Sequence, residues 1–488
     1  MNKVLQILLI FTLFIAKESS GQLGNYWTLQ VSTEGTLLSG ALVAAKSNNA
    51  GFFYNPASMS SNQESSFSFN TSFFRVYSLD YKNPFGENTE LTHFTGNFDP
   101  IFLSFLVPKK NKLDIKLGIS IMGKQNTDIR LEDRVFIKDY SFPNLSTSLG
   151  DYEGIYDYRL RSSEYWVNLS ASKKFNEKFS LGVTTIIAYR SLDYENNILS
   201  NFVSSNFLDL NSTSSFQTLT KSFMYNYKLI FKVGAIYTLN DHSRLGLNIT
   251  TRSYNIYGRG SNKKSVSQTN IGNLILDTTG VLIDDHLLSS YADNLKANFK
   301  SPFSIALGYN IEFERDEFGI AIEYFNEIEP YRVITGEETG EFINTTTNLV
   351  SETDFLDLSY GQKSIMNIAI SYERHINEIF TMLTGFRTNF TTSLGNDYEE
   401  EFQFNHIQDI DINYYHFTGG STFTLLNNKF IFGADIAISF NSGLPNVVNF
   451  SEPLVINDQG FPLRGDLQNN ASIRNFMIGF VLGYSLKF

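Results

Sequence analysis

Five basic side chains are the residues of this sequence best suited to binding an anion. Arg190, Lys228, Lys232, Arg252 and Arg387 each stand at the opposite parity from a row of apolar residues. Successive side chains of a strand point to opposite faces of a sheet, so each of these cations faces away from an apolar surface. Guanidinium and ammonium groups donate charge-assisted hydrogen bonds to carboxylates and phosphates. If their strands are neighbours, the five residues predict a site for an anionic head group.

Three acidic residues leave a second interpretation open. Glu323, Glu373 and Asp435 also stand at the polar parity of their segments. Cations and carboxylates that share one face can neutralise each other. In that case the basic residues form a network of ion pairs and not a ligand site.

The chain shows no catalytic signature. It contains no G-x-S-x-G, no H-E-x-x-H and no phosphate-binding glycine loop. We therefore expect neither an enzyme nor a bound cofactor. The net charge of −12 argues against a nucleic-acid-binding surface, and the absence of cysteine excludes disulfides and thiolate metal sites.

The elements that must position these residues repeat with a period of two. In Phe476–Phe488 one parity is wholly apolar and aromatic, whereas the other is mostly small or polar. The ranges Phe430–Phe440 and Phe303–Ile311 repeat this pattern. Apolar rows opposed by small and polar rows are typical of barrels that face lipid outside and water inside.

Counting by this period predicts fourteen strands, whose connections are alternately short and long. The predicted strands are 66–78, 99–107, 113–123, 160–173, 179–194, 221–239, 244–258, 299–312, 317–332, 363–375, 378–392, 411–426, 429–441 and 474–488. Short periplasmic turns and longer outer loops are the rule in outer-membrane barrels. We therefore predict an all-β, 14-stranded antiparallel transmembrane β-barrel over residues 66–488. The alternative, an exported protein of two or three soluble β-sandwiches, explains the alternation of residues but not that of the loops.

The N-terminus predicts export. Lys3 precedes the apolar core Val4–Ala16, and the small residues Ser19–Gly21 follow it. This core is too short to span a membrane as a helix, so we interpret residues 1–21 as a cleaved signal peptide. The even number of strands then places both ends of the barrel in the periplasm of the bacterial outer membrane.

Residues 22–65, between the signal peptide and the barrel, do not fit a membrane strand. A run of small residues, Leu37–Ala45, precedes Gly51–Met59, and Gly51 and Pro56 indicate a turn. Small residues favour tight packing, so this segment either hangs in the periplasm or folds back into the lumen as a plug.

The small residues followed by an aromatic residue and Asn55-Pro56-Ala57 resemble the hatch signature of FadL-type outer-membrane transporters. The resemblance implies a fourteen-stranded barrel with a lumenal hatch, in which Asn55, Pro56 and Ala57 contact the barrel wall. It also implies passive transport of long-chain fatty acids or other hydrophobic compounds, with outer-membrane lipid and lipopolysaccharide as surroundings. In that family an inward kink of the third strand opens the wall. The matching strand here, 113–123, holds Gly118 but no proline, so its sequence permits a kink without requiring one.

Two further interpretations stay open. Some relatives of that family are non-transporting scaffolds for protein secretion at the cell surface, which implies a surface or secretion partner protein. The acidic runs Glu399–Glu401 and Asp284–His286 lie in predicted outer loops. They meet either solvent or the divalent ions that bridge lipopolysaccharide, and we predict no metal site in the chain itself.

Overall fold

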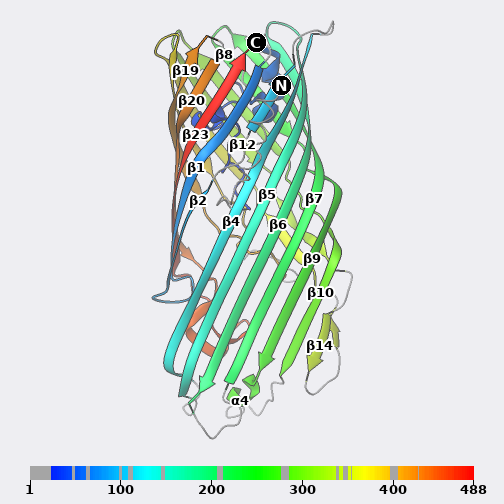
Figure 1. Cartoon of the computed structure of the whole chain (residues 1–488), viewed down its shortest axis with the longest axis vertical. Coiled ribbons are helices and arrows are strands. Elements are labelled where there is room, and N and C mark those ends of the chain that lie inside the picture. The colour runs from blue at the N-terminus through cyan, green and yellow to red at the C-terminus, as the bar shows by residue number, and fades with distance from the viewer. Residues whose placement is uncertain are drawn as a thin grey trace, which may run out of the picture.

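The computed structural model forms one closed antiparallel β-barrel (Figure 1). It describes residues 23–46, 50–61, 66–97, 102–107, 114–143, 149–205, 213–275, 285–336, 340–344, 350–352, 354–395, 405–426 and 428–487. The predicted signal peptide, Phe488 and Glu399–Glu401 lie outside these residues. The last strand, β23 (Ala471–Lys487), pairs with both the first strand, β1 (Ser66–Lys82), and β20 (Asn428–Leu444), which closes the barrel.

Several barrel strands are interrupted, and their two pieces carry separate labels. The intervening strands are β2 (Glu90–Asn97) with β3 (Phe102–Leu106), β4 (Ile115–Ser141), β5 (Leu149–Lys174), β6 (Phe179–Ser204), β7 (Thr213–Asn240), β8 (Ser243–Thr250) with β9 (Tyr254–Thr269), β10 (His286–Ala297) with β11 (Ser304–Glu312), β12 (Asp316–Phe325) with β13 (Ile328–Thr335), β16 (Leu358–Gln362) with β17 (Ile365–His375), β18 (Phe380–Asn389) and β19 (Tyr414–Leu425). Counting each interrupted strand once, the barrel has fourteen strands, which confirms the predicted fold.

Alternation of side chains follows the pattern that the sequence predicts. On β23, Phe476, Phe480 and Leu482 are exposed on the outside, whereas Met477 and Val481 are buried inside. Apolar side chains that remain exposed over a continuous belt indicate a surface that lipid covers.

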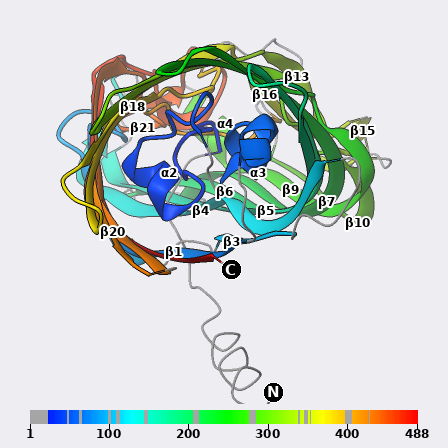
Figure 2. The same cartoon turned by 90° about the horizontal axis from the view of Figure 1, so that it is seen from above.

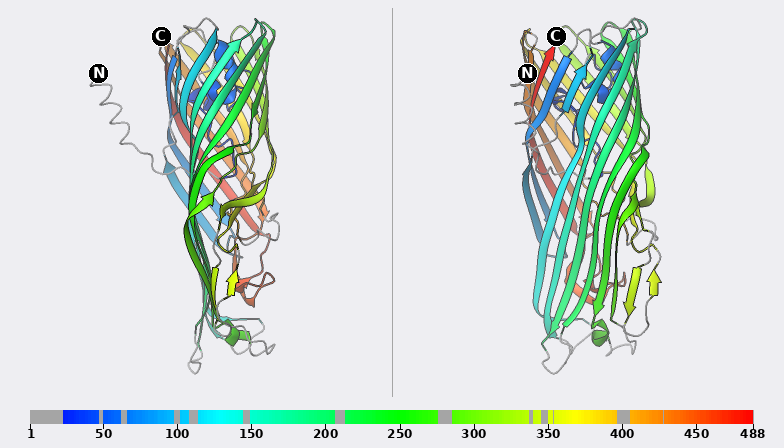
Figure 3. Two further views of the ribbon diagram at one scale, coloured as in Figure 1. Left: turned by 90° about the vertical axis from the view of Figure 1, so that its right-hand side faces the viewer. Right: turned by 45° about the vertical axis from the view of Figure 1, so that its right-hand side comes forward.

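The strands on one side of the barrel are much longer than predicted. β4 to β7 run for 26 to 28 residues each, and this side projects well beyond the rest (Figure 3). Their outward residues change from apolar to charged part of the way along, for example from Tyr165 to Arg161 and Asp157 on β5. The apolar row ends there while the backbone ladder continues, so periodicity alone predicted strands that were too short.

One predicted strand is wrong over its first residues. Residues 298–303 are not a strand but bend into the lumen between β10 and β11, where Phe299 is fully buried. The strands predicted from the sequence also omit β2. We call the end of the barrel with the short connections, uppermost in Figure 1, the turn end, and the opposite end the loop end.

The N-terminal segment, residues 23–61, lies inside the barrel near the turn end (Figure 2). It contains α2 (Thr33–Leu37), α3 (Gly51–Tyr54) and a 3-10 helix, η1 (Pro56–Ser61). The side chain of Ser32 accepts a hydrogen bond from the Gly35 amide and so caps α2.

Inward glycines of the wall make room for this segment. At each of them an added Cβ would come within 3.0 Å of an atom of the N-terminal segment. They are Gly118, Gly182, Gly234, Gly246, Gly308, Gly319, Gly385, Gly420, Gly433 and Gly483. Since they lie on ten different barrel strands, the segment packs against most of the circumference of the wall.

Two further segments fill the lumen toward the loop end. The hairpin of β21 (Asn449–Ile456) and β22 (Pro462–Gly465) packs inside the projecting strands, where Tyr152 Oη donates to Leu463 O (2.8 Å). Residues 405–413, which we call the lumen segment, precede β19 and bury Ile407 and Ile412. The remaining described elements are α4 (Ile271–Ile275), β14 (Gly340–Asn344) and β15 (Val350–Glu352). Among the described residues, no helix is long and apolar enough to cross a membrane.

Candidate functional site

A small chamber lies between the N-terminal segment and the wall. Its apolar lining consists of the aromatic rings of Tyr26, Trp27, Phe53, Trp166, Phe299 and Phe325. Its charged lining consists of Lys124, Arg190, Lys232, Lys300, Glu164 and Glu323. The cavity volume is about 60 Å³. Small-molecule sites usually enclose roughly 300–1,000 Å³, so the chamber is closed in this conformation.

Arg190 and Lys228 meet a carboxylate that sequence reasoning missed. Arg190 Nη1 and Lys228 Nζ both donate to Glu164 Oε2, at 3.1 and 3.0 Å. All three side chains are buried. Glu164 stands on the inward parity of β5, opposite Tyr165, so the period of two contains the signal that places it. This part of the cluster is an ion-pair network, as the second interpretation expected.

Two lysines of the chamber have different partners. Lys232 Nζ donates to Phe53 O (2.9 Å) and lies 4.4 Å from the centre of the Phe53 ring. Lys124 Nζ donates to Tyr26 O (2.7 Å) and lies 5.1 Å from the same ring. Within the described residues, no carboxylate oxygen lies within 4.0 Å of either ammonium group. Both charges are therefore available to a ligand at the Phe53 ring.

Lys124 lies in a β-bulge of β4, at the inward parity of Ser120 and Met122. The register of β4 against β5 shifts between Gly123 and Gln125, so Lys124 is an extra residue with no partner in the ladder. A bulge re-aims the side chain at its position. Alternation gives Lys124 this inward parity, but the predicted strand ended at residue 123, and Lys124 was therefore missed.

Arg252 and Arg387, the other two predicted cations, lie elsewhere. Arg252 is exposed, in the break between β8 and β9. Arg387 is fully buried and donates from Nη2 to Asp435 Oδ2 and to His416 Nδ1, both at 2.7 Å. Its Nε also donates to Trp27 O (3.2 Å), so Arg387 holds the N-terminal segment against the wall.

The remaining acids of the predicted network have separate partners. Glu323 accepts hydrogen bonds from Trp27 Nε1 (2.8 Å) and Ser304 Oγ (2.7 Å). Glu373 lies 3.6 Å from His375 Nε2. The structure thus brings Arg190, Lys228 and Lys232 together, but it does not bring all five cations to one place.

Asn55, Pro56 and Ala57 contact the wall at β6, β7 and β8. Asn55 Nδ2 donates to Ala235 O on β7 (3.0 Å) and to Leu247 O on β8 (3.3 Å), and also to Val43 O (2.7 Å) within the segment. Asn55 Oδ1 accepts from the Ala57 amide (3.0 Å). One amide side chain thereby joins two parts of the N-terminal segment to two strands.

Next to the bulge, the described residues of β4 have one strand partner. Pairing between β3 and β4 ends at Phe102 and Met122, and the pairing shown for β2 is with β1 alone. Over the described residues, β4 beyond Met122 therefore pairs only with β5. Gly118 lies in an unbroken part of β4, against Phe52 of the N-terminal segment.

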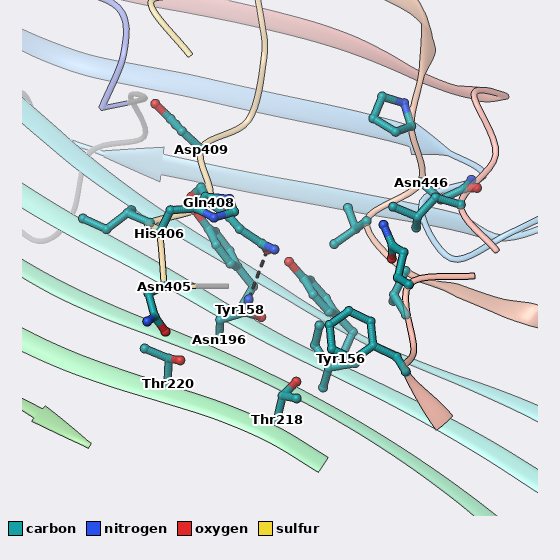
Figure 4. Close-up of a pocket in the computed structure, with 18 of the residues that line it drawn as sticks. Tyr156, Tyr158, Asn196, Thr218, Thr220, Asn405, His406, Gln408, Asp409 and Asn446 are labelled. Atoms are coloured by element: carbon teal, nitrogen blue, oxygen red, sulfur yellow. Dashed lines mark hydrogen bonds between the residues drawn. The ribbon is translucent and has the colours of Figure 1, made fainter. Parts of the chain in front are cut away.

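A second, larger cavity lies toward the loop end, and we call it the outer vestibule. Its volume is about 1260 Å³. Figure 4 shows Tyr156 and Tyr158 on one wall and Gln408 and Asp409 of the lumen segment on another. Asn196 Nδ2 donates to Gln408 Oε1 (3.1 Å), and Tyr158 Oη donates to Gln408 O (2.8 Å). The lumen segment thus lies between the vestibule and the chamber.

Comparison with solved structures shows which fold this is. A Pseudomonas aeruginosa FadL homologue superposes with a TM-score of 0.54 at 14% identity, over 95% of this chain and 100% of that chain. The chain has the fold of FadL-type barrels. The Pseudomonas putida toluene transporter TodX gives 0.55 at 14% identity, over 94% of this chain and 99% of that one. The monoaromatic hydrocarbon channel CymD gives 0.53 at 11% identity, over 94% and 98%.

Sequence comparison adds nothing to this result. No protein-family model matches the chain, and no curated protein matches it. Identities of 11 to 15% show the FadL-type fold but carry no cargo over to this chain.

Proposed function

We propose that this FadL-type barrel is a member of the FadL family and a passive channel for hydrophobic compounds in the bacterial outer membrane. Residues 1–21 are its signal peptide, the N-terminal segment is its hatch, and the turn end faces the periplasm. The apolar outer belt supports this placement. A row of outward tyrosines, paired across β5, β6, β7 and β9, ends the belt: Tyr165, Tyr189, Tyr227 and Tyr257. Aromatic girdles of this kind lie at membrane interfaces.

The cargo we propose is an amphiphile with an anionic head, of which a long-chain fatty acid is the simplest example. The observation that carries this proposal is the pair Lys124 and Lys232, whose ammonium groups both lie close to the Phe53 ring. Their ammonium groups donate to backbone oxygens and to no described carboxylate. A carboxylate would bind between them while the aromatic rings of the chamber cover the start of the chain.

Passage requires the N-terminal segment to move, since the chamber is closed. Lys124 lies where the described pairing of β4 is with β5 alone, so the proposed exit is sideways into the outer membrane beside Lys124. Removing apolar area from water contributes about 25 cal/mol per Å², which favours binding in the chamber without an energy source.

The test is mass spectrometry of lipids that co-purify with the protein in mild detergent, followed by binding of oleate. The double substitution Lys124→Gln and Lys232→Gln should weaken oleate binding at least tenfold and leave binding of oleyl alcohol unchanged. Lys263→Gln, an exposed lysine on β9, is the matched control. Equal oleate affinity in the double variant and the control contradicts the anionic cargo, while bound neutral hydrocarbons would still support the channel.

A second candidate function is the non-transporting secretion scaffold. The closed chamber and the projecting strands β4 to β7 favour it. In the same purification, the scaffold predicts a co-purifying protein and no lipid, and the channel predicts the reverse.

A further inference from the structure

A buried arginine lies in the wall of the outer vestibule. Arg464 stands on β22, is 5% exposed and contributes to the lining of the vestibule. Its guanidinium lies beside two aromatic rings, 4.7 Å from the centre of Phe216 and 5.2 Å from that of Phe461. These contacts hold the guanidinium plane in one place, which is the arrangement that recognises planar anions.

The hydrogen bonds of Arg464 leave its charge uncompensated. Nη2 donates to Ile198 O (3.1 Å) and to Thr218 Oγ1 (3.0 Å), both of them neutral acceptors. Nε is buried with no hydrogen-bond partner. Arg190 and Arg387 are also buried, but they differ from Arg464 because each of them pairs with a carboxylate.

A buried charge without a counter-ion is costly, so its retention needs a reason. Burial lowers the pKa of Arg464 to about 9. The side chain therefore keeps its proton at neutral pH. No carboxylate of the described residues lies within 4.0 Å of it.

The other charged groups around the vestibule have roles or surroundings of their own. Asp354 pairs with Arg332 (3.4 Å). Asp409 Oδ2 accepts a hydrogen bond from Tyr360 Oη (3.3 Å), and Asp409 Oδ1 accepts one from the Ile410 amide (3.0 Å). Asp458 is exposed on the hairpin between β21 and β22. The cations Lys264 and Lys363 also line the cavity, as does Asp411.

The surfaces near Arg464 are both aromatic and polar. Tyr156 and Tyr158 are parallel, with an angle of 4° between their rings and 6.2 Å between ring centres. Asn196 and Thr218 supply amide and hydroxyl groups close to them (Figure 4). With about 1260 Å³, the vestibule has room for a molecule of drug size.

We propose that the outer vestibule is a capture site for organic carboxylates with an aromatic body, in which Arg464 binds the carboxylate. The aromatic rings of Phe461, Tyr156 and Tyr158 pack against the body of the ligand. This site is separated from the chamber by the lumen segment, and binding there does not depend on transport or on Lys124 and Lys232.

The test measures binding to the full chain in lipid nanodiscs by ¹⁹F NMR. The probes are 3-[4-(trifluoromethyl)phenyl]propanoate and the corresponding alcohol, with empty nanodiscs to subtract partition into lipid. We expect the wild-type protein to bind the acid at least tenfold more tightly than the alcohol. Arg464→Gln should remove that difference, Arg464→Lys should keep part of it, and Arg130→Gln, an exposed arginine outside the barrel, should change nothing.

The location is tested with a spin label, because the chain contains no cysteine. A label at Gln459→Cys, an exposed position lining the vestibule, should broaden the acid resonance. A label at Ala45→Cys in the N-terminal segment should not. Equal binding of acid and alcohol by the wild-type protein overturns the proposal even if Arg464→Gln does not fold. Unchanged acid affinity in a folded Arg464→Gln variant, or broadening from Ala45 alone, overturns it as well.

Discussion

Replacing Gly246 with alanine is expected to displace the N-terminal segment from the wall. A Cβ at Gly246 would lie 2.6 Å from the carbonyl carbon of Val43 and 2.8 Å from Ala44 Cα. These are backbone atoms, so no side-chain rotation relieves the overlap. Ordinary contact begins at 3.4 Å, and Val43 O lies closer still to the added Cβ than the carbonyl carbon does. The segment must therefore retreat by at least the difference between 3.4 and 2.6 Å, about 0.8 Å.

That retreat has an energetic cost that the structure lets us estimate. Moving Val43 and its neighbours away from β8 lengthens the bond from Asn55 Nδ2 to Leu247 O, which is already 3.3 Å. Losing one such bond costs about 1 kcal/mol, and overpacking costs at least about 1 kcal/mol more. A total of about 2 kcal/mol raises the population of displaced segment about 30-fold.

Two readouts check this displacement. Gly246→Ala should raise ion conductance in planar bilayers, and it should speed thiol labelling of a cysteine placed at the buried Ala45. Gly419→Ala is the matched control, because Gly419 faces outward on β19 with nothing within 4 Å of an added Cβ. If Gly246→Ala and Gly419→Ala gave the same conductance and labelling rate, the packing argument would be refuted.

Two further predictions concern buried charges. Burial raises the pKa of Asp409 to about 7, above the ordinary value near 4. The protonated carboxyl therefore makes its full contribution to stability below pH ~4, and this contribution is lost as the pH rises through about 7. The free energy of unfolding, measured in urea, should fall by up to about 4 kcal/mol over that pH range. The variant Asp409→Asn should show no such fall, and a parallel fall in the variant would contradict the assignment to Asp409. Arg387→Gln leaves Asp435 buried without its cation and should destabilise the barrel by about 3–5 kcal/mol, measured as a lower unfolding midpoint. Arg387→Met with Asp435→Leu should recover most of that loss, and failure to recover it would show that the pair acts through some other contact.

Alternation predicted the barrel because it follows directly from the lipid outside and the packed polar lumen inside. It failed where one of these conditions ends. Beyond Tyr165 the outward residues of β5 meet water, so Arg161 and Asp157 carry no apolar row although the ladder continues. Residues 298–303 interrupt the strand, although Asn298 and Phe303 keep backbone hydrogen bonds to neighbouring segments. An apolar residue such as Phe299 fits the alternation equally well in a strand and in a buried loop.

The candidate site was predictable only in part, for a related reason. Parity placed Arg190, Lys228 and Lys232 inside correctly, and it contains the signal for Glu164. Lys124 also has the inward parity of Met122, but the predicted strand ended at residue 123, and the bulge reverses the parity only beyond Lys124. Arg252 was misplaced because the break between β8 and β9 ends the alternation just before it. Which cations are neutralised depends on register across strands, and a single sequence does not determine register.

The N-terminal segment, beside the chamber, and the lumen segment, beside the vestibule, contact each other directly. Asn25 of the N-terminal segment donates through Nδ2 to Asn389 O (3.0 Å) and to Ile412 O (3.1 Å) of the lumen segment. Gly24 packs against Asp409, where an added Cβ would lie 2.9 Å from Oδ2. A ligand that displaces the lumen segment from the vestibule side therefore removes one acceptor from Asn25. At about 1 kcal/mol for such a bond, the closed state of the chamber loses roughly fivefold in population relative to the open one. For the channel proposed above, occupancy of the vestibule then loosens the next layer without any source of energy.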